Sequence, residues 1–245
     1  MGLCFRERGH RHAGRQMIKF PLICLITAAM MLQPGRSSAL SVDDLDKRIL
    51  DCDLVLRSAL NMPDGGIPTD LLRRCRGLAI FPGVLKLGIV VGIDFGSGVM
   101  LRRDEKTAQW SKPAFFTIRT ASLGVQAGAQ STDLILLIMN ESSLRNLLED
   151  RFALGADISV AAGPVGREAS AETDVTLTSG MLSYSRSKGV FVGLSLKGAV
   201  LKPDDEANEI YHGKGVSVQD VYYEGQGRPL DGARILVETL NAATK

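Results

Sequence analysis

His212 is the residue best suited to proton-transfer chemistry, because it is the one histidine of the chain beyond residue 12. A histidine acts as a general base when a carboxylate orients it towards a nucleophile. Neither Tyr211 nor Gly213 supplies that carboxylate, and we expect this segment to be an exposed loop. A hydrolase would need His212 to meet a serine and a carboxylate from elsewhere in the chain. A solvated histidine is the commoner case, so the sequence does not predict an enzyme.

Glycine-rich patterns typical of cofactor sites are incomplete. Residues 96–98 (Gly-Ser-Gly) begin like a dinucleotide-binding loop, but Leu101 occupies the third glycine position. Residues 213–215 (Gly-Lys-Gly) lack the rest of a phosphate-binding loop. No Cys/His cluster has the spacing of a zinc site, and the paired aspartates mark helix starts rather than a calcium loop. We therefore expect neither a cofactor nor a metal.

Residues 1–39 are organised like a secretory signal. They hold six of the 29 basic residues and one of the 27 acidic residues, followed by an apolar run over 20–32 and small residues at 37–39. A membrane span needs about 20 apolar residues, more than this run contains. The pattern predicts a signal peptide over 1–39 and a single domain over 40–245 that is periplasmic or otherwise exported. An uncleaved signal anchor is the alternative.

The charge of the predicted domain argues against nucleic acid as a partner. Without residues 1–39, 23 basic and 26 acidic residues remain, a net charge of −3. Bulk attraction to a polyanion needs the opposite sign, although local basic patches remain compatible with this balance.

Two cysteines remain in the predicted domain, Cys52 and Cys75. An exported compartment permits a disulfide between them, provided that their Cα atoms lie within about 7 Å. Two buried thiols that never meet are the alternative, and the sequence leaves both open.

Hydrophobic periodicity predicts helices at both ends of the domain and strands between them. We expect helices over 41–60, 69–75, 140–151, 204–211, 217–223 and 232–243, and strands over 78–81, 84–102, 114–139, 154–162, 173–181 and 190–196. Pro82 and Gly83 are expected to form a turn between the first two strands.

The stretch over 84–102 is the most informative of these. Its odd positions are almost all apolar, whereas glycine and charged residues fill the even positions. Strands usually run 3–10 residues, so this stretch must kink or split, with its glycines as corners of a curved sheet. We predict an α+β domain with a mainly antiparallel, strongly curved β barrel or sandwich and with N-terminal and C-terminal helices.

Several motifs in a fixed order resemble the SYLF-domain family over roughly residues 70–225. They are residues 76–83 (RGLAIFPG), the glycines at 92, 96 and 98, residues 110–113 (WSKP), 124–129 (GVQAGA), 132–133 (TD), 159–167 (SVAAGPVGR) and 183–193 (SYSRSKGVFVG). The resemblance implies a lipid-binding module that is not an enzyme. The eukaryotic members bind phosphoinositide membranes and associate with cortical actin.

The resemblance also implies which residues bind lipid. Membrane-active members use an amphipathic segment with basic residues, and the matching segment here is 71–76 (LLRRCR). Leu71 and Leu72 would enter the headgroup boundary while arginines contact phosphates. A short core-capping helix with buried leucines is the alternative. The implied lipid-binding residues are Arg73, Arg74, Arg76, Lys86, Arg186 and Lys188.

An exported chain would not meet actin, so we expect membrane phospholipid as the partner and actin to be unlikely. Acidic residues at the start of the 41–60 helix disfavour it as an anchor on anionic membranes. A structural or protein-interaction module of the cell envelope is the alternative function. The bare glycine face discriminates between them, because a covered face favours a scaffold and an apolar cavity favours a lipid.

Overall fold

The computed structural model describes residues 39–62, 66–88, 91–123, 128–148, 152–164, 179–187, 190–193, 196, 198–228 and 230–245. Leu40–Lys245 forms one compact unit. The predicted signal peptide, apart from its last residue, lies outside the described residues, as does most of the strand predicted over 173–181.

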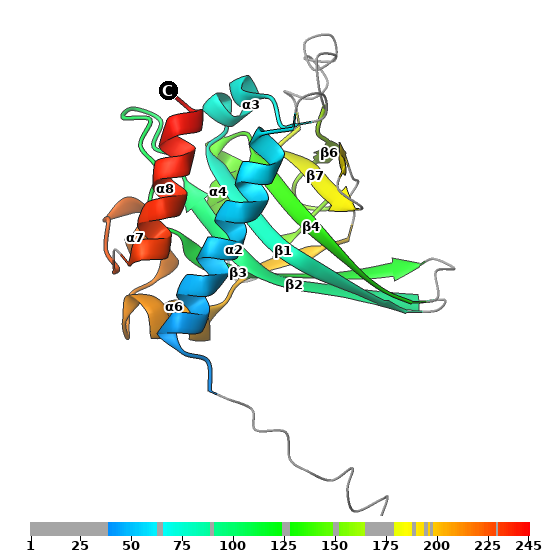
Figure 1. Ribbon diagram of the computed structural model, residues 1–245, viewed down its shortest axis with the longest axis horizontal. Helices are drawn as coiled ribbons and strands as arrows, with labels where there is room; N and C mark the ends of the chain where they lie inside the picture. The colour runs from blue at the N-terminus through cyan, green and yellow to red at the C-terminus, as the bar shows by residue number, and fades with distance from the viewer. Residues whose placement is uncertain are drawn as a thin grey trace, which may run out of the picture. The chain divides into compact units, whose positions relative to one another are not determined.

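Helices begin and end the described unit, with strands between them (Figure 1). In chain order the elements are α2 (Val42–Leu60), α3 (Thr69–Arg74), β1 (Gly77–Gly88), β2 (Val91–Arg102), β3 (Ala114–Leu123), β4 (Gly128–Ile138), α4 (Glu141–Leu147), β5 (Phe152–Ala153), β6 (Val160–Ala162), β7 (Met181–Ser187), β8 (Val190–Gly193), β9 (Val200–Pro203), α6 (Asp205–His212), α7 (Val218–Tyr223) and α8 (Asp231–Ala243).

The strands form one sheet that curls into a half-barrel. Its order is β5-β9-β3-β2-β1-β4-β7-β6, with β8 paired to β7. All pairings are antiparallel except that between β6 and β7. The predicted fold class, α+β with a mainly antiparallel curved sheet and terminal helices, is confirmed. Strand β9 was missed, because its two apolar residues are followed by a lysine and a proline and show no strand pattern.

The stretch over 84–102 is a hairpin rather than one long strand. Leu85 pairs with Phe95 and Gly88 with Gly92 across β1 and β2. Cross-strand partners share a face of the sheet, and here odd positions pair with odd positions. The alternation of apolar and bare positions therefore runs through the reversal unbroken, and the sequence pattern could not reveal it.

Pro82 and Gly83 form a bulge inside β1 instead of the predicted turn. The register of β1 shifts there against both of its neighbours, and Gly83 has φ +58°. The backbone of the bulged strand lies unusually close to the neighbouring strand β2, and a glycine on β2 makes room for it. A Cβ added at Gly98 on β2 would lie 2.0 Å from the carbonyl oxygen of Ile80 and 2.7 Å from the ring of Phe81.

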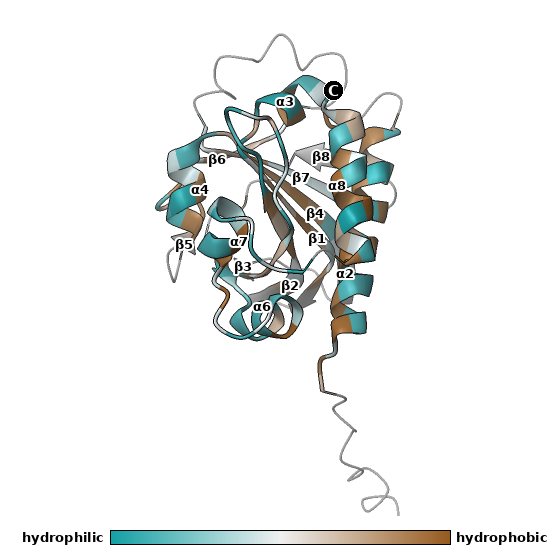
Figure 2. Ribbon diagram, turned by 90° about the vertical axis from the view of Figure 1, so that its left-hand side faces the viewer, coloured by the Kyte–Doolittle hydropathy of each residue, from teal (hydrophilic) through white to brown (hydrophobic). Residues whose placement is uncertain are grey.

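Both faces of the sheet are covered where the core lies. Helices α2, α6 and α8 cover one face over residues such as Ile80, Val99 and Leu137. Helices α4 and α7 cover the other face over residues such as Phe81 and Phe116. Figure 2 shows the strands between these two helical layers. Apolar residues of α2 and α8 belong to the core cluster on their side of the sheet.

Helices α2 and α8 lie side by side and run in the same direction. Asp46 on α2 accepts a hydrogen bond from the backbone N–H of Gly232 at the start of α8, at 3.0 Å. Further along, Asp53 accepts hydrogen bonds from Arg57 and Thr239, both at 2.6 Å. These contacts tie the first and last helices together, so the described unit is closed by its own two ends.

Candidate functional site

Helix α3 points its apolar side chains into the core. Leu72 has no exposed surface, and Leu71 is also buried. Both belong to the cluster beneath α2 and α8, because α3 closes one end of that core. The expectation that these leucines enter a headgroup boundary is therefore wrong, and the core-capping alternative is correct.

The arginines of this segment face outward. We call Arg73, Arg74 and Arg76 the α3 patch. Arg73 pairs with Asp70 at 3.1 Å and donates to the backbone oxygen of Lys245 at 2.6 Å. Arg76 pairs with Glu105. Exposed ion pairs of this kind are worth about 0–1 kcal/mol, so such arginines can change partner at little cost.

Arg74 differs from its two neighbours. It is exposed and makes no hydrogen bond or ion pair with any other residue in the described part of the chain. The α3 patch therefore offers one guanidinium without a competing carboxylate, flanked by two weakly held ones.

Arg186 holds the fold together and is not a free surface cation. Its Nε and Nη2 donate to Asp133 Oδ2 at 2.9 and 2.6 Å, and its Nη1 donates to Ser58 on α2. Asp133 Oδ1 accepts the backbone N–H of Gly83 at 3.0 Å. These hydrogen bonds of Arg186 and Asp133, which we call the Arg186 cluster, join β7, β4, the β1 bulge and α2. Asp133 belongs to the 132–133 motif of the family, but its role as the partner of Arg186 could not be predicted from the sequence.

The two lysines predicted to bind lipid are not placed by the structure. The backbone of Lys86 lies in β1 opposite Asp94 and Gln130, but its side chain lies outside what is described. Lys188 lies outside the described residues altogether.

Both cysteines are buried free thiols. Cys52 Sγ donates to the carbonyl of Ile80 at 3.5 Å, and Cys75 Sγ donates to that of Leu72 at 3.2 Å. Burial raises the pKa of both thiols, that of Cys75 to about 12. The disulfide is not formed in the structure, which has the second of the two alternatives, and neither thiol is reactive as placed.

His212 is buried rather than exposed, because α6 extends one residue further than predicted and turns its ring inward. Its Nε2 lies 2.9 Å from the carbonyl oxygen of Pro113. Burial lowers its pKa and favours the neutral ring. Within the described residues no serine or carboxylate hydrogen-bonds to it. Its contact with Pro113 fixes the segment that leads into β3.

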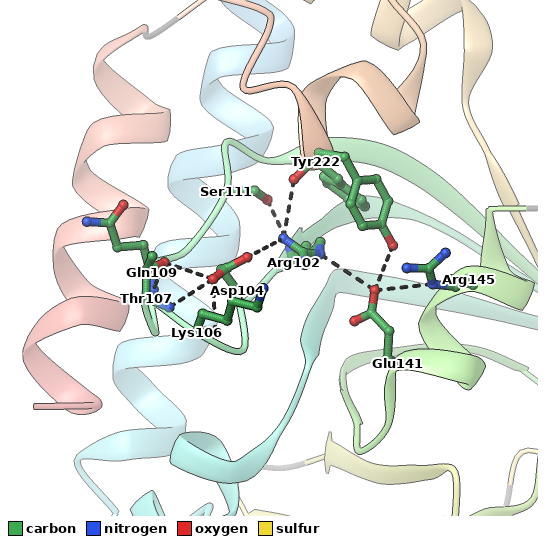
Figure 3. A network of polar contacts seen from close by, with 10 residues as sticks. Arg102, Asp104, Lys106, Thr107, Gln109, Ser111, Glu141, Arg145 and Tyr222 are labelled. Carbon is green, nitrogen blue, oxygen red and sulfur yellow. Dashed lines mark hydrogen bonds and ion pairs between the residues drawn. The ribbon is translucent and has the colours of Figure 1, made fainter.

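An open groove of about 380 Å³, absent from the sequence analysis, lies between the 102–112 loop and α7. Figure 3 shows Arg102 between Asp104 and Glu141. Asp104 accepts hydrogen bonds from the backbone N–H and hydroxyl of Thr107 at 2.8 and 3.0 Å. These bonds lower its pKa to about 2. The Asp104 carboxylate therefore stabilises the 102–112 loop and is not available to a ligand.

Other charged side chains around this groove are also occupied. The Arg102 guanidinium lies 4.5 Å from the centre of the Tyr223 ring, and Tyr223 donates its hydroxyl proton to Glu141 at 2.9 Å. Lys112, from the WSKP motif, donates to three successive backbone carbonyls at residues 225–227. The network fastens the loop to α7 and leaves few charges for a ligand.

The second half of the chain defines the class of protein. Residues 119–243, just over half of the chain, match the profile of the family described as Ysc84, Las17-binding protein actin regulator. The chain belongs to this family, which is the Ysc84/SYLF family that the motifs predicted.

Its relatives are longer proteins. The chain is 37% identical to protein YSC84 of Saccharomyces cerevisiae over 153 residues, 61% of this chain and 32% of that protein. It is 28% identical to SH3 domain-containing YSC84-like protein 1 of Homo sapiens over 186 residues, 76% of this chain and 54% of that protein. The matched region thus spans about a third of the yeast relative and about half of the human one. In the described part of this chain, no helix has the length and apolar character needed to cross a membrane.

Proposed function

We propose that residues 40–245 bind phospholipid membrane surfaces, with the α3 patch contacting phosphate headgroups and the curled sheet acting as a rigid scaffold. The observation that carries this proposal is Arg74, an exposed arginine without a carboxylate partner among the described residues, between Arg73 and Arg76. Guanidinium groups form paired hydrogen bonds with phosphate oxygens.

The expected affinity is modest and depends on salt. A basic residue near an anionic membrane contributes about 1 kcal/mol, and Leu71 and Leu72 add no insertion because they are buried. The predicted domain carries a net charge of −3, so attraction must come from the local patch rather than from overall charge. This supports general anionic phospholipid binding more than phosphoinositide specificity.

Vesicle co-sedimentation of residues 40–245 tests the proposal, with circular dichroism to show that the protein is folded. We expect binding to phosphatidylglycerol vesicles at low salt, and weaker binding after R73Q, R74Q and R76Q are combined. The matched control combines K202Q, K214Q and R228Q, three exposed cations without hydrogen-bonded partners among the described residues. It removes the same charge elsewhere and should keep wild-type binding. Equal losses in both triple variants would contradict a role for the α3 patch.

We further propose that residues 1–39 direct export to the periplasm or beyond the cell. The supporting pattern is the basic start, apolar run and small residues described above. Intact mass of the native protein should show its removal near residue 39. Recovery of the uncut chain in the cytosolic fraction would contradict export, and would make the actin regulation named for the family a candidate function here too.

A structural or protein-interaction module is the second candidate, and one observation favours it. The bare glycine face of β2 is filled by the sheet itself, since Ile80 and Phe81 press against Gly98 and Val84 against Gly96. Cβ atoms added at those glycines would meet side chains of the core that α4 and α7 cover, so the glycines serve packing on that face. If folded residues 40–245 fail to bind anionic vesicles at low salt, this second candidate is favoured.

A further inference from the structure

A hollow of about 470 Å³ lies between α2 and the part of the sheet formed by β1 and β2. Figure 1 shows these strands continuing past α2, so that helix and sheet diverge. The hollow borders the first three turns of α2, whereas α3 and its patch follow the other end of that helix. It is thus separate from the α3 patch.

The sheet side of the hollow is apolar. Phe95 is 47% exposed, one of few large hydrophobic side chains with so much open surface in the described residues. Leu85 is directly paired with it across β1 and β2, so both lie on the face that α2 covers further along. Single exposed apolar residues are common, but two paired at the base of a hollow form a surface that favours an acyl chain.

The helix side of the hollow carries both signs of charge. Asp44, Lys47, Arg48 and Asp51 line it from one side of α2, at the spacing of successive turns. Lys47 and Asp51 are exposed, yet neither makes a hydrogen bond or ion pair with another described residue.

Arg48, in contrast, is occupied. Its Nη1 is shielded from solvent and lies 3.6 Å from the carboxylate of Asp204, and its guanidinium lies 5.7 Å from the centre of the Phe115 ring. The groove of Figure 3, where most charges are occupied, offers no such set of available groups. The hollow therefore holds a cation, Lys47, and an anion, Asp51, that have no partner among the described residues, beside an apolar floor.

These groups complement an amphiphile with both charges in its headgroup. Lys47 suits a phosphate, and Asp51, one turn further along the helix, suits an ammonium group. A purely anionic headgroup would be repelled by Asp44 and Asp51. We infer that the hollow binds a single zwitterionic phospholipid of the phosphoethanolamine type, with the start of its acyl chain on Leu85 and Phe95. The inference rests on the proposed phospholipid binding and names a second, distinct lipid class.

Calorimetric titration of the full chain with monomeric lysophosphatidylethanolamine and lysophosphatidylglycerol tests this site. We expect wild type to prefer the ethanolamine lipid by about fivefold, the size of one weak ionic contact. Phe95→Ser should weaken binding of both lipids by a similar factor, because it removes the apolar floor.

A charge reversal separates ligand recognition from a structural role. Asp51→Lys should invert the preference in favour of the anionic glycerol lipid. The matched control is Asp43→Lys, an exposed aspartate on the same helix that does not line the hollow, and it should keep the wild-type preference. Equal wild-type affinities for the two lipids, or the same response to both reversals, would overturn the inference.

The α3 patch variants distinguish this inference from the proposed function. The R73Q, R74Q and R76Q combination should lose binding to anionic vesicles but keep the lysophosphatidylethanolamine affinity. If wild type binds anionic vesicles but shows no preference for the ethanolamine lipid, the inference about the hollow is wrong and the proposed function stands. If the α3 patch variant no longer binds lysophosphatidylethanolamine, the hollow and the α3 patch are not separate sites.

Discussion

Arginines in this domain divide into those that hold the fold and those that face a possible ligand. Arg186 and Arg102 are engaged by carboxylates and ring faces, whereas Arg74 has no partner among the described residues. The sequence could not separate them, because the partner of Arg186, Asp133, lies 53 residues away in the chain. Basic character is visible in a sequence, but its availability depends on long-range pairing.

Replacing Arg186 should therefore affect stability more than replacing Arg74. Arg186→Met leaves Asp133 partly buried without its partner and should lower the free energy of unfolding by about 2 kcal/mol. Arg74→Met should change it by less than about 0.5 kcal/mol. Urea unfolding of both variants measures the difference. Equal unfolding midpoints for the two variants would show that the Arg186 cluster does not stabilise the fold.

Asp104 gives a pH dependence with a definite sign. Hydrogen bonds from Thr107 lower its pKa from an ordinary 3.8 to about 2 in the folded protein. The stabilisation of its loop is therefore complete above the ordinary value and is lost as the pH falls towards 2. A carboxyl-carbon NMR titration should give that low midpoint, and Thr107→Ala should raise it. A wild-type midpoint near 3.8 would contradict the described loop.

The hairpin of β1 and β2 shows what periodicity can and cannot reveal about an element. The terminal helices were predicted closely, since apolar spacing in both and the Ser41 cap of α2 are local signals. The reversal near residue 90 and the bulge at Pro82 and Gly83 were not, because strand pairing and close backbone approach are long-range. The predicted turn was wrong for that reason, and the stretch over 84–102 splits as expected, but as a hairpin.

Gly98 should tolerate no side chain, because its added Cβ would meet the Ile80 carbonyl. Gly98→Ala should cost about 1–3 kcal/mol through overpacking. Ser97→Ala, one residue earlier and pointing to the opposite face, serves as the control and should stay within about 0.5 kcal/mol. Thermal unfolding compares them, and a wild-type melting temperature for Gly98→Ala would refute the close approach of the bulge.

At the scale of the whole molecule, the described unit is a half-barrel with both core faces covered and its two terminal helices joined. The fold class could be predicted from hydrophobic periodicity, and the family from several motifs that occur in order along the chain. The lipid-binding role of the α3 patch stays a prediction, and Arg186, predicted to act with it, is instead held by Asp133. The hollow beside α2 joins a helix to a distant hairpin, and no local pattern signals it.

Thiol labelling measures how tightly α2 and α3 cover the core. Cys52 and Cys75 have no exposed surface, so a thiol reagent should react with both only when the protein unfolds. Labelling rates in increasing urea should follow the unfolding curve. Fast labelling of the native protein would mean that α2 or α3 opens easily, and two unreactive cysteines after unfolding would reveal the disulfide.

The salt dependence of vesicle binding tests the central claim most directly, namely that the α3 patch meets phospholipid headgroups. We predict that residues 40–245 bind phosphatidylglycerol vesicles with an affinity that falls as salt rises. The R73Q, R74Q and R76Q variant should bind weakly with a flattened salt dependence, while the K202Q, K214Q and R228Q variant should match wild type. An identical salt slope for wild type and both variants would contradict the account.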